Sequence, residues 1–351
     1  MLNKYVYILL ILTVLIISCS KKNNDINDIS ENKKSINIEE SKFYLLKGNI
    51  AGEKADMYLY VNEKNKKVSG YYYTKNKKAM ITGSINNNRL NLNELDENNN
   101  IYASISGNLS DDIVLNAEIK YDEINEIKDM EFYLNRNLPV YYADIVDYYK
   151  NDNLSNSIFS YHRTLLLFSK NTDIKSLDMQ SSINYVEEEC GNYYNEWKEL
   201  LYSGADNAVY EIDNTVNVGY IDNRIIALDN YSSMYTGYDN IVKANIQEVF
   251  SLESSNLITI RDLIDDFYNT DLIRLMRDKI LKTGSVKEDY FKFNSITLES
   301  STFRILPNSI NFVWQVYDIA PYTTGITEIS FTFEELKPYV KEDSPLYYLF
   351  L

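Results

Sequence analysis

Short segments in which hydrophobic and polar positions alternate run along the chain from residue 43 to residue 137. Clear alternation is present at residues 55–61, 77–85 and 101–109, and turn-forming runs such as 98–100 separate the segments. A period of two residues is typical of strands with one buried face. About eight such strands at roughly ten-residue spacing predict an antiparallel barrel or sandwich whose sheet edges are closed.

The pattern changes after residue 138, where helical and strand periods are mixed. Residues 177–202 place apolar side chains three or four positions apart, and Gly204 follows them. This spacing predicts an amphipathic helix that ends at the glycine. A second helix is expected at residues 271–282, and residues 158–169 are expected to form a buried strand.

These patterns predict an α+β fold class, in which an N-terminal all-β antiparallel barrel-like domain is followed by a mixed α+β domain. The expected boundaries are 1–18 for a lipoprotein signal peptide, 19–41 for a disordered tether, 42–138 for the β-domain and 139–351 for the α+β domain. A chain of 351 residues is long enough for two such domains.

The first eighteen residues have the pattern of a secretory signal. Lys4 precedes an apolar run at residues 6–17, and Cys19 follows directly after a serine. The run is too short for an ordinary membrane-spanning helix. The residues before Cys19 resemble the lipobox of bacterial lipoproteins, which implies a lipid on the Cys19 thiol and a place in the cell envelope, outside the cytoplasm. The alternative is an uncleaved anchor, or an ordinary signal with a chance cysteine.

The segment after Cys19 is polar. Residues 20–41 carry charges of both signs and few large apolar groups, so they are expected to be a disordered tether. A coil of about twenty residues would hold the folded part on the order of 25 Å from the membrane.

The charge balance excludes one class of partner. The chain has 35 Lys+Arg and 51 Asp+Glu, a formal net charge of −16. Nucleic-acid binding needs a basic surface that releases counterions from the phosphates, so no nucleic acid is expected as a partner. A basic protein is compatible with this charge.

Residues for catalysis or metal binding are scarce. His162 is the single histidine, and Cys190 is the single thiol besides Cys19. Zinc sites with two or three histidines are therefore excluded within one chain, and no nucleophile elbow is present. We expect no cofactor, no metal and no catalytic residue, with His162 a satisfied histidine and Cys190 an inert core thiol. A catalytic pair of carboxylates that are far apart in the sequence remains an alternative.

The C-terminal part of the chain resembles a known domain family. The residues that carry the resemblance are 310–316, then Tyr317-Asp318-Ile319-Ala320-Pro321-Tyr322-Thr323-Thr324-Gly325, then 329–333 and Glu335-Leu336-Lys337. This order resembles DUF3298, a domain of unknown function marked by a strand, the phrase Y-x-I-A-P-Y-A-x-G, a strand and a helix opening with E-L-K. Upstream, Tyr235-Thr236-Gly237 and residues 257–264 resemble the partner segment of that family.

The resemblance implies a role in recognition. The same domain occurs in the extracellular part of RsiV, an anti-sigma factor that binds lysozyme, and beside the catalytic domain of peptidoglycan deacetylases. An RsiV-like envelope module is therefore expected. The chain departs from the family at residues 237–240, where Gly-Tyr-Asp-Asn stands in place of a G-G-A-H turn. No function of that histidine is expected here.

The family phrase also has a physical interpretation. Pro321 fixes its own φ, Gly325 permits a positive φ, and Tyr317 and Tyr322 flank the resulting turn. A rigid loop with aromatic residues favours recognition of a partner. The alternative is a corner that packs two strands, with the tyrosine hydroxyls satisfied locally. The candidate binding or structural residues are Tyr317, Asp318, Pro321, Tyr322, Gly325, Tyr235 and Gly237.

Three functions follow from these features. The main hypothesis is non-catalytic recognition by a lipid-anchored envelope protein, with lysozyme, another basic protein or peptidoglycan as the partner. The second is a peptidoglycan-directed, carbohydrate-active enzyme with an unidentified carboxylate pair. The third is a carrier of a small apolar ligand in the N-terminal barrel, although barrels of this size are usually filled by their own side chains.

Overall fold

The structure is a computed structural model that describes most of the chain after residue 32. The described residues are 33–74, 77–96, 100–110, 114–121, 126–135, 141–154, 156–169, 176–204, 208–237, 241–254, 256–284 and 286–351. The expected signal peptide, Cys19 and the first part of the expected tether lie outside them. Every helix among the described residues is too short or too polar to cross a bilayer.

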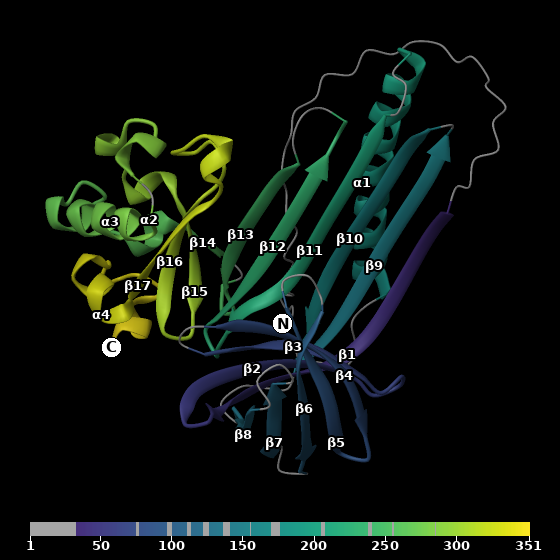
Figure 1. Ribbon diagram of the computed structural model, residues 1–351, viewed down its shortest axis with the longest axis horizontal. Helices are drawn as coiled ribbons and strands as arrows, with labels where there is room; N and C mark the ends of the chain where they lie inside the picture. The colour runs from purple at the N-terminus through teal and green to yellow at the C-terminus, as the bar shows by residue number, and fades with distance from the viewer. Residues whose placement is uncertain are drawn as a thin grey trace, which may run out of the picture.

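The fold is mainly β, with antiparallel strands and a few helices (Figure 1). The strands are β1 (Lys33–Ile50), β2 (Glu53–Asn62), β3 (Lys67–Tyr73), β4 (Lys78–Asn86), β5 (Arg89–Leu95), β6 (Ile101–Leu109), β7 (Val114–Tyr121), β8 (Glu126–Leu134), β9 (Tyr141–Leu154), β10 (Ser157–Ser169), β11 (Val209–Ile221), β12 (Ile225–Tyr235), β13 (Val242–Ser251), β14 (Leu257–Ile258), β15 (Thr302–Leu306), β16 (Ser309–Trp314) and β17 (Thr327–Thr332). The helices are α1 (Ser176–Tyr202), α2 (Ile260–Leu263), α3 (Thr270–Lys282) and α4 (Phe333–Leu336). Strands β1–β14 form one continuous sheet. Strands hold most of the described residues, so helices are a smaller part of the molecule than the predicted α+β class implies.

Strands β1–β8 close into an eight-stranded antiparallel barrel. The second half of β1 pairs with β2 over residues 42–50 and with β8 over residues 46–50. Closure removes the free edges of this part of the sheet. The inward side chains, among them Met57, Leu59 and Phe132, form a buried core that fills the interior. The barrel expected from the alternating pattern is thus confirmed.

The first half of β1 corrects the predicted tether. Residues 33–43 pair with β9, so residues 33–41, the last part of the predicted tether, belong to a strand. Ile36 and Ile38 alternate with polar neighbours, and the edge of β9 supplies the hydrogen-bond partners that a disordered segment would lack. β1 therefore runs from the upper part of the molecule into the barrel (Figure 1). It has 18 residues and is about 60 Å long at roughly 3.3 Å per residue.

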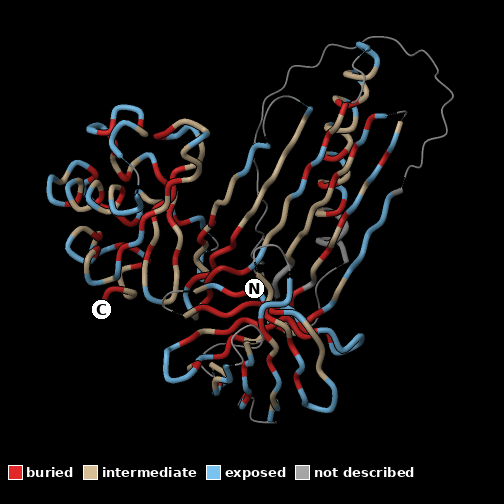
Figure 2. Tube along the Cα trace, in the orientation of Figure 1, coloured by how far each residue is buried: buried red, intermediate tan, exposed pale blue. Residues whose placement is uncertain are grey.

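The upper sheet consists of the first half of β1 with β9–β14, and α1 covers one of its faces (Figures 1 and 2). The helix crosses from β10 to its parallel neighbour β11. Its buried side chains Val186 and Trp197 pack with Phe159 and Tyr161 of β10. The indole Nε1 of Trp197 also donates a hydrogen bond to the Ala208 carbonyl at 3.1 Å. The apolar stripe of α1 is therefore what attaches it to the sheet.

The locally encoded elements agree with the sequence. The helix predicted at residues 177–202 is α1, and Gly204 follows it with a φ of +88°. The helix predicted at residues 271–282 is α3, and the strand predicted at residues 158–169 is β10, although only one of its faces is buried, with Phe159 and Tyr161 inside and Ile158 43% exposed. These predictions are confirmed to within one residue at each end.

The C-terminal part of the chain forms a small sheet of its own, β15–β16–β17, with α3 and α4 packed against β17. Phe312, Phe331 and Met276 belong to its buried core. The start of α4 is capped twice, because Thr332 Oγ1 accepts from the Glu335 amide and Glu335 accepts from the Thr332 amide. This capping box satisfies two backbone donors at the helix start.

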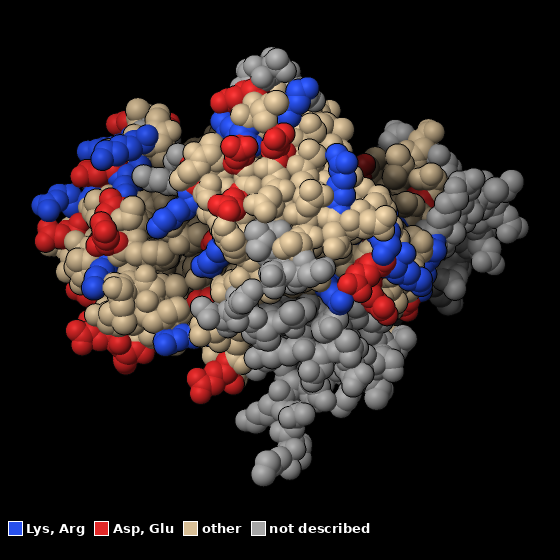
Figure 3. Space-filling view, turned by 90° about the horizontal axis from the view of Figure 1, so that it is seen from below, with Lys and Arg blue, Asp and Glu red and all other residues tan. Residues whose placement is uncertain are grey.

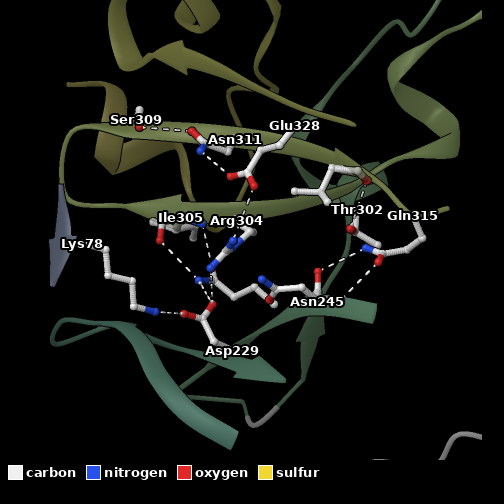
Figure 4. A network of polar contacts seen from close by, with 12 residues as sticks. Lys78, Asp229, Asn245, Thr302, Arg304, Ile305, Ser309, Asn311, Gln315 and Glu328 are labelled. Carbon is white, nitrogen blue, oxygen red and sulfur yellow. Dashed lines mark hydrogen bonds and ion pairs between the residues drawn. The ribbon is translucent and has the colours of Figure 1, made fainter. Parts of the chain in front are cut away.

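A buried polar network joins the barrel, the upper sheet and the C-terminal sheet (Figure 4). At its centre, Asp229 of β12 pairs with Lys78 of β4 at 3.0 Å and with Arg304 of β15 at 3.3 Å. Gln247 of β13 donates to Asp229 at 2.8 Å and accepts from the Ile305 amide at 2.6 Å. We call these residues the junction network.

Gly219 of β11 makes room for the junction network. A Cβ atom at this position would lie 2.4 Å from Gln247 Nε2 and 2.7 Å from Asp229 Oδ1. The glycine also lies where the register between β11 and β12 shifts. A bulge without a side chain thus lets two buried polar groups approach the backbone.

Candidate functional site

An open hollow lies on the upper sheet where β10, β11, β12 and the start of β13 are side by side. Its volume of about 320 Å³ is at the lower end of the range of about 300–1,000 Å³ that is typical of small-ligand pockets. Its lining residues are Ser160, His162, Glu211, Ile212, Asp213, Ser233, Tyr235 and Ile241. We call it the His162 hollow.

Strand alternation decides which side chains reach the His162 hollow. On β10, Phe159 and Tyr161 pack with α1, so His162 points from the opposite face of the sheet. The register places His162 beside Asp213 of β11 and places Asp213 beside Ser233 of β12. Three polar side chains therefore form a row across three neighbouring strands.

The His162 ring is held between two carboxylates. Its Nδ1 lies 2.7 Å from Asp213 Oδ1, and its Nε2 lies 3.6 Å from Asp147 Oδ1 on β9. The Thr164 hydroxyl donates to Asp147 at 2.8 Å. The ring of Tyr149 stacks on the imidazole, with centroids 4.2 Å apart and planes 6° apart. Contacts on both nitrogens and on the ring face leave the imidazole one orientation.

These contacts set the charge of His162. Burial alone would lower its pKa, but the hydrogen bonds and charges of Asp147 and Asp213 raise the pKa to about 9. Burial would in turn raise the pKa of Asp147, yet His162 and Thr164 hold that pKa below its usual value. At neutral pH the ring is thus an imidazolium between two carboxylates. Such a ring has no free lone pair with which to act as a general base.

The predicted Pro321 motif forms an aromatic loop beside the hollow, residues 317–325, which we call the tyrosine loop. Tyr317 adopts a left-handed φ of +71°, and Gly325 has the positive φ expected for it, +75°. The Tyr322 hydroxyl donates to the Ile241 carbonyl at 2.9 Å, and Ile241 lines the His162 hollow. The Tyr317 ring lies 6.2 Å from the Tyr322 ring and is 60% exposed. One tyrosine thus fixes the loop while the other faces solvent.

A second contact fixes the base of the tyrosine loop to β13. Gln315 Nε2 donates to the backbone carbonyl of Asn245 at 3.1 Å, and the backbone amide of Asn245 donates to Gln315 Oε1 at 3.2 Å. The Asp318 carboxylate accepts a hydrogen bond from the backbone amide of Gln315 at 2.7 Å, which holds the turn that precedes Pro321. Side chains thereby satisfy backbone groups along the edge of β13, where another strand could otherwise pair.

The structure brings some of the predicted site residues together. Tyr235 lines the hollow, and Tyr322 contacts its rim through Ile241. Pro321, with a φ of −66°, precedes the short turn at Tyr322–Thr324. Gly237, two residues after the end of β12, has a φ of +78°, which favours glycine, and it does not line the hollow.

The polar members of the hollow are not apparent from the sequence. The sequence predicts a satisfied histidine at position 162 and does not place Glu211 and Asp213 beside it. The available signal was the pair of polar alternations, Ser-x-His on β10 and Glu-x-Asp on β11, each on the face opposite buried aromatic residues. The pairing of the two strands, which makes one site of them, leaves no mark in the local pattern.

A second hollow, of about 340 Å³, is lined by residues 265–266, 269 and 338–343 of the C-terminal part. Four of its side chains are acidic: Asp265, Asp266, Glu342 and Asp343. In the described part of the chain, His, Cys, Asp and Glu form no group of three or more that could hold a metal ion. Acidic residues alone do not make this hollow a binding site.

Comparisons with known proteins give structural neighbours. No family model and no curated protein matches the chain. A solved structure of a DUF3298 member from Bacteroides fragilis NCTC 9343 is 14% identical, covers 59% of this chain and 96% of its own, and has a TM-score of 0.47. Another, from Pseudomonas aeruginosa PAO1, is 10% identical, covers 54% and 88%, and has a TM-score of 0.35. Both are DUF3298 proteins.

Proposed function

We propose that this chain is a lipid-anchored, non-catalytic recognition protein of a bacterial cell envelope, and that its partner is a basic protein such as lysozyme. The observation that carries the proposal is the exposed Tyr317, which a rigid loop holds beside a hollow with carboxylates. The lipobox-like residues before Cys19 support the anchor. The likeness of the tyrosine loop to the DUF3298 phrase supports the RsiV-like recognition role.

The surroundings of Tyr317 favour a protein contact. Ile241, Val242 and Phe291 are 42%, 47% and 50% exposed, and the Phe291 amide donates to the Ile319 carbonyl inside the loop segment. Exposed aromatic and aliphatic side chains on a rigid support are typical of the energetically important centre of a protein interface. The loop needs little ordering when it binds, which favours affinity.

The chemistry of the hollow supports a non-catalytic role. A glycosidase acid has a raised pKa, whereas Asp147 has a lowered pKa. The Asp213 carboxylate is engaged by the His162 imidazolium at 2.7 Å. The Asp147 pKa is therefore held low and Asp213 is fixed by an ion pair, an arrangement that suits recognition better than proton transfer.

The net charge supports a basic partner at the encounter stage. A charge of −16 accelerates association with a cationic protein through long-range attraction. On the face seen in Figure 3, acidic and basic side chains are interspersed, so charge does not mark a single patch there. We therefore assign specificity to the tyrosine loop and not to the overall charge.

The test is binding of the full chain, in detergent, to lysozyme across a salt series, with a second basic protein of similar charge as the control. We expect micromolar or tighter binding to lysozyme that survives about 0.3 M salt, where the Debye length is roughly 5–6 Å. Tyr317→Ala should weaken it by about tenfold or more, because a central aromatic contact is lost. Tyr133→Ala, which removes a 46% exposed tyrosine from the barrel strand β8, is the matched control.

Binding that disappears with salt, or that the second basic protein shares, would reduce the interaction to the charge of an acidic chain. Equal effects of Tyr317→Ala and Tyr133→Ala would overturn the role of the tyrosine loop.

The anchor is tested separately. Cys19→Ser should abolish incorporation of labelled palmitate into the protein in the producing cells, because the thiol that would carry the lipid is absent. Incorporation equal to that of the wild-type chain would contradict lipid attachment at Cys19.

A further inference from the structure

We infer that the His162 hollow is a binding site for a neutral saccharide unit. The inference goes beyond the proposed protein partner, because it uses the floor of the hollow and not the exposed Tyr317. It rests on the mixture of hydrogen-bonding groups, on the charge balance and on the rigidity of the site.

Sugar hydroxyl groups both donate and accept hydrogen bonds, so they suit a lining that does both. Glu211 and Asp213 supply carboxylate acceptors, and the Ser160 and Ser233 hydroxyls can act either way. The His162 imidazolium, which also lines the hollow, supplies a fixed positive charge beside Asp213. Tyr235 adds an aromatic ring and a hydroxyl to the wall.

The charge balance disfavours other ligand classes. Asp147, Asp213 and Glu211 surround one cation, His162, so a phosphate or carboxylate ligand would meet net repulsion. The apolar side chains of the lining are limited to Ile241 and the Tyr235 ring, because the Ile212 side chain packs under α1 on the opposite face, and this is too little for an apolar ligand. The Asp213 carboxylate is already paired with the His162 imidazolium at 2.7 Å, which weakens its attraction for a cationic ligand. A neutral ligand with several hydroxyl groups meets neither the repulsion of an anion nor the shortage of apolar lining.

The site is rigid before any ligand binds. Its side chains project from paired strands, and the contacts of His162 with Asp147, Asp213 and the Tyr149 ring fix the central residue. A site on regular strands keeps its geometry better than one on loops. Weakly held sugar hydroxyls depend on such pre-organisation, because each immobilised group otherwise costs entropy.

The test uses His162 as its own reporter. It is the single histidine of the chain, so its imidazole resonances in histidine-labelled full-length protein report on the hollow alone. The protein is titrated in detergent with three neutral saccharides, chitotriose, cellobiose and maltose, and with agmatine as a cationic probe. We expect a saturable shift of the His162 resonances with at least one saccharide and none with agmatine.

Two variants and one control complete the test. Tyr235→Ala and Glu211→Gln should each raise the dissociation constant by about tenfold or more, which corresponds to about 1.4 kcal/mol. Glu211 is exposed, so its variant folds even if Tyr235→Ala does not. Tyr231→Ala is the matched control, because Tyr231 lies on β12 with the same strand parity as Tyr235 but does not line the hollow. It should change the constant by less than about twofold.

The inference is overturned if no saccharide of the panel shifts the His162 resonances, if agmatine alone does, or if Tyr231→Ala acts like Tyr235→Ala. These outcomes are separate from the lysozyme test. A chain that binds lysozyme through Tyr317 but ignores all three saccharides would keep the proposed function and lose this site.

Discussion

The Lys78 ammonium lies 3.0 Å from the Asp229 carboxylate, although the two residues are 151 positions apart. Lys78 begins a barrel strand, Asp229 lies in the upper sheet, and Arg304 reaches the same carboxylate from the C-terminal sheet (Figure 4). The side chains of Asp229 and Arg304 are only 8% and 11% exposed. One buried carboxylate therefore pairs with two cations from two other parts of the molecule, and Arg304 has a second carboxylate, Glu328, at 3.6 Å.

Replacing Asp229 with alanine should destabilise the protein by about 3–5 kcal/mol, because Lys78 would lose its carboxylate and the largely buried Arg304 would keep only the more distant Glu328 at 3.6 Å. The free energy of unfolding from urea denaturation measures the effect. Arg274→Ala breaks the exposed pair with Asp271, whose side chains are 73% and 63% exposed, and should cost less than about 0.5 kcal/mol. Similar values for the two variants would contradict the central role of Asp229.

The same carboxylate predicts a loss of stability in acid. Burial alone would raise the pKa of Asp229, but Lys78 and Arg304 outweigh it and hold the pKa below its usual value. A lowered folded-state pKa adds stability above the unfolded pKa of about 3.9, and this stability is lost as the pH falls through the folded value. Wild-type stability should therefore fall more steeply below about pH 4 than that of Asp229→Asn. Parallel pH curves would refute this.

His162 should titrate at an unusually high pH. Its pKa is raised to about 9, against the effect of burial, by Asp147 and Asp213. Such a group adds stability below the unfolded pKa of about 6.5, and the contribution is lost as the pH rises through about 9. NMR titration of the single imidazole checks the value. Asp213→Asn should lower the pKa of His162 towards 6.5, whereas Glu40→Gln, an exposed change on β1, should leave that pKa unchanged.

Two glycine-to-alanine changes should have opposite signs. Gly48 lies where β1 pairs with both β2 and β8, and a Cβ there would lie 1.9 Å from the Glu131 carbonyl oxygen. Gly48→Ala should cost about 1–3 kcal/mol by pushing the closing strands apart. Gly191 lies inside α1 with open space around its Cβ position, so Gly191→Ala should stabilise by about 0.5–1 kcal/mol. Thermal and urea unfolding measure both, and a stabilising Gly48→Ala would be incompatible with the closed barrel.

The Cys190 thiol should be unreactive in the folded chain. It is 1% exposed among the residues under α1, and burial raises its pKa, so little thiolate is available. In a Cys19→Ser background, a thiol reagent should label Cys190 only at the rate at which the protein unfolds, and fully in denaturant. Rapid labelling of the native protein would mean that α1 does not cover this part of the sheet.

Much of the molecule follows from local sequence. The helical spacing before Gly204 predicts α1, and the alternating segments predict the strands that close into the barrel. The positive φ of Gly325 follows from its place after Pro321. These features depend on neighbours within a few residues, because side-chain periodicity and backbone preference are local properties.

The tertiary structure decided the rest. Residues 33–41 read as a tether by composition, and only the free edge of β9 makes them part of a strand. His162 acquires its charge from Asp147 and Asp213, which other strands bring to it, and Asp229 acquires its partners from the barrel and the C-terminal sheet. Strand pairing and burial bring together groups that are far apart in the chain, and a local pattern carries no record of which strands will be neighbours.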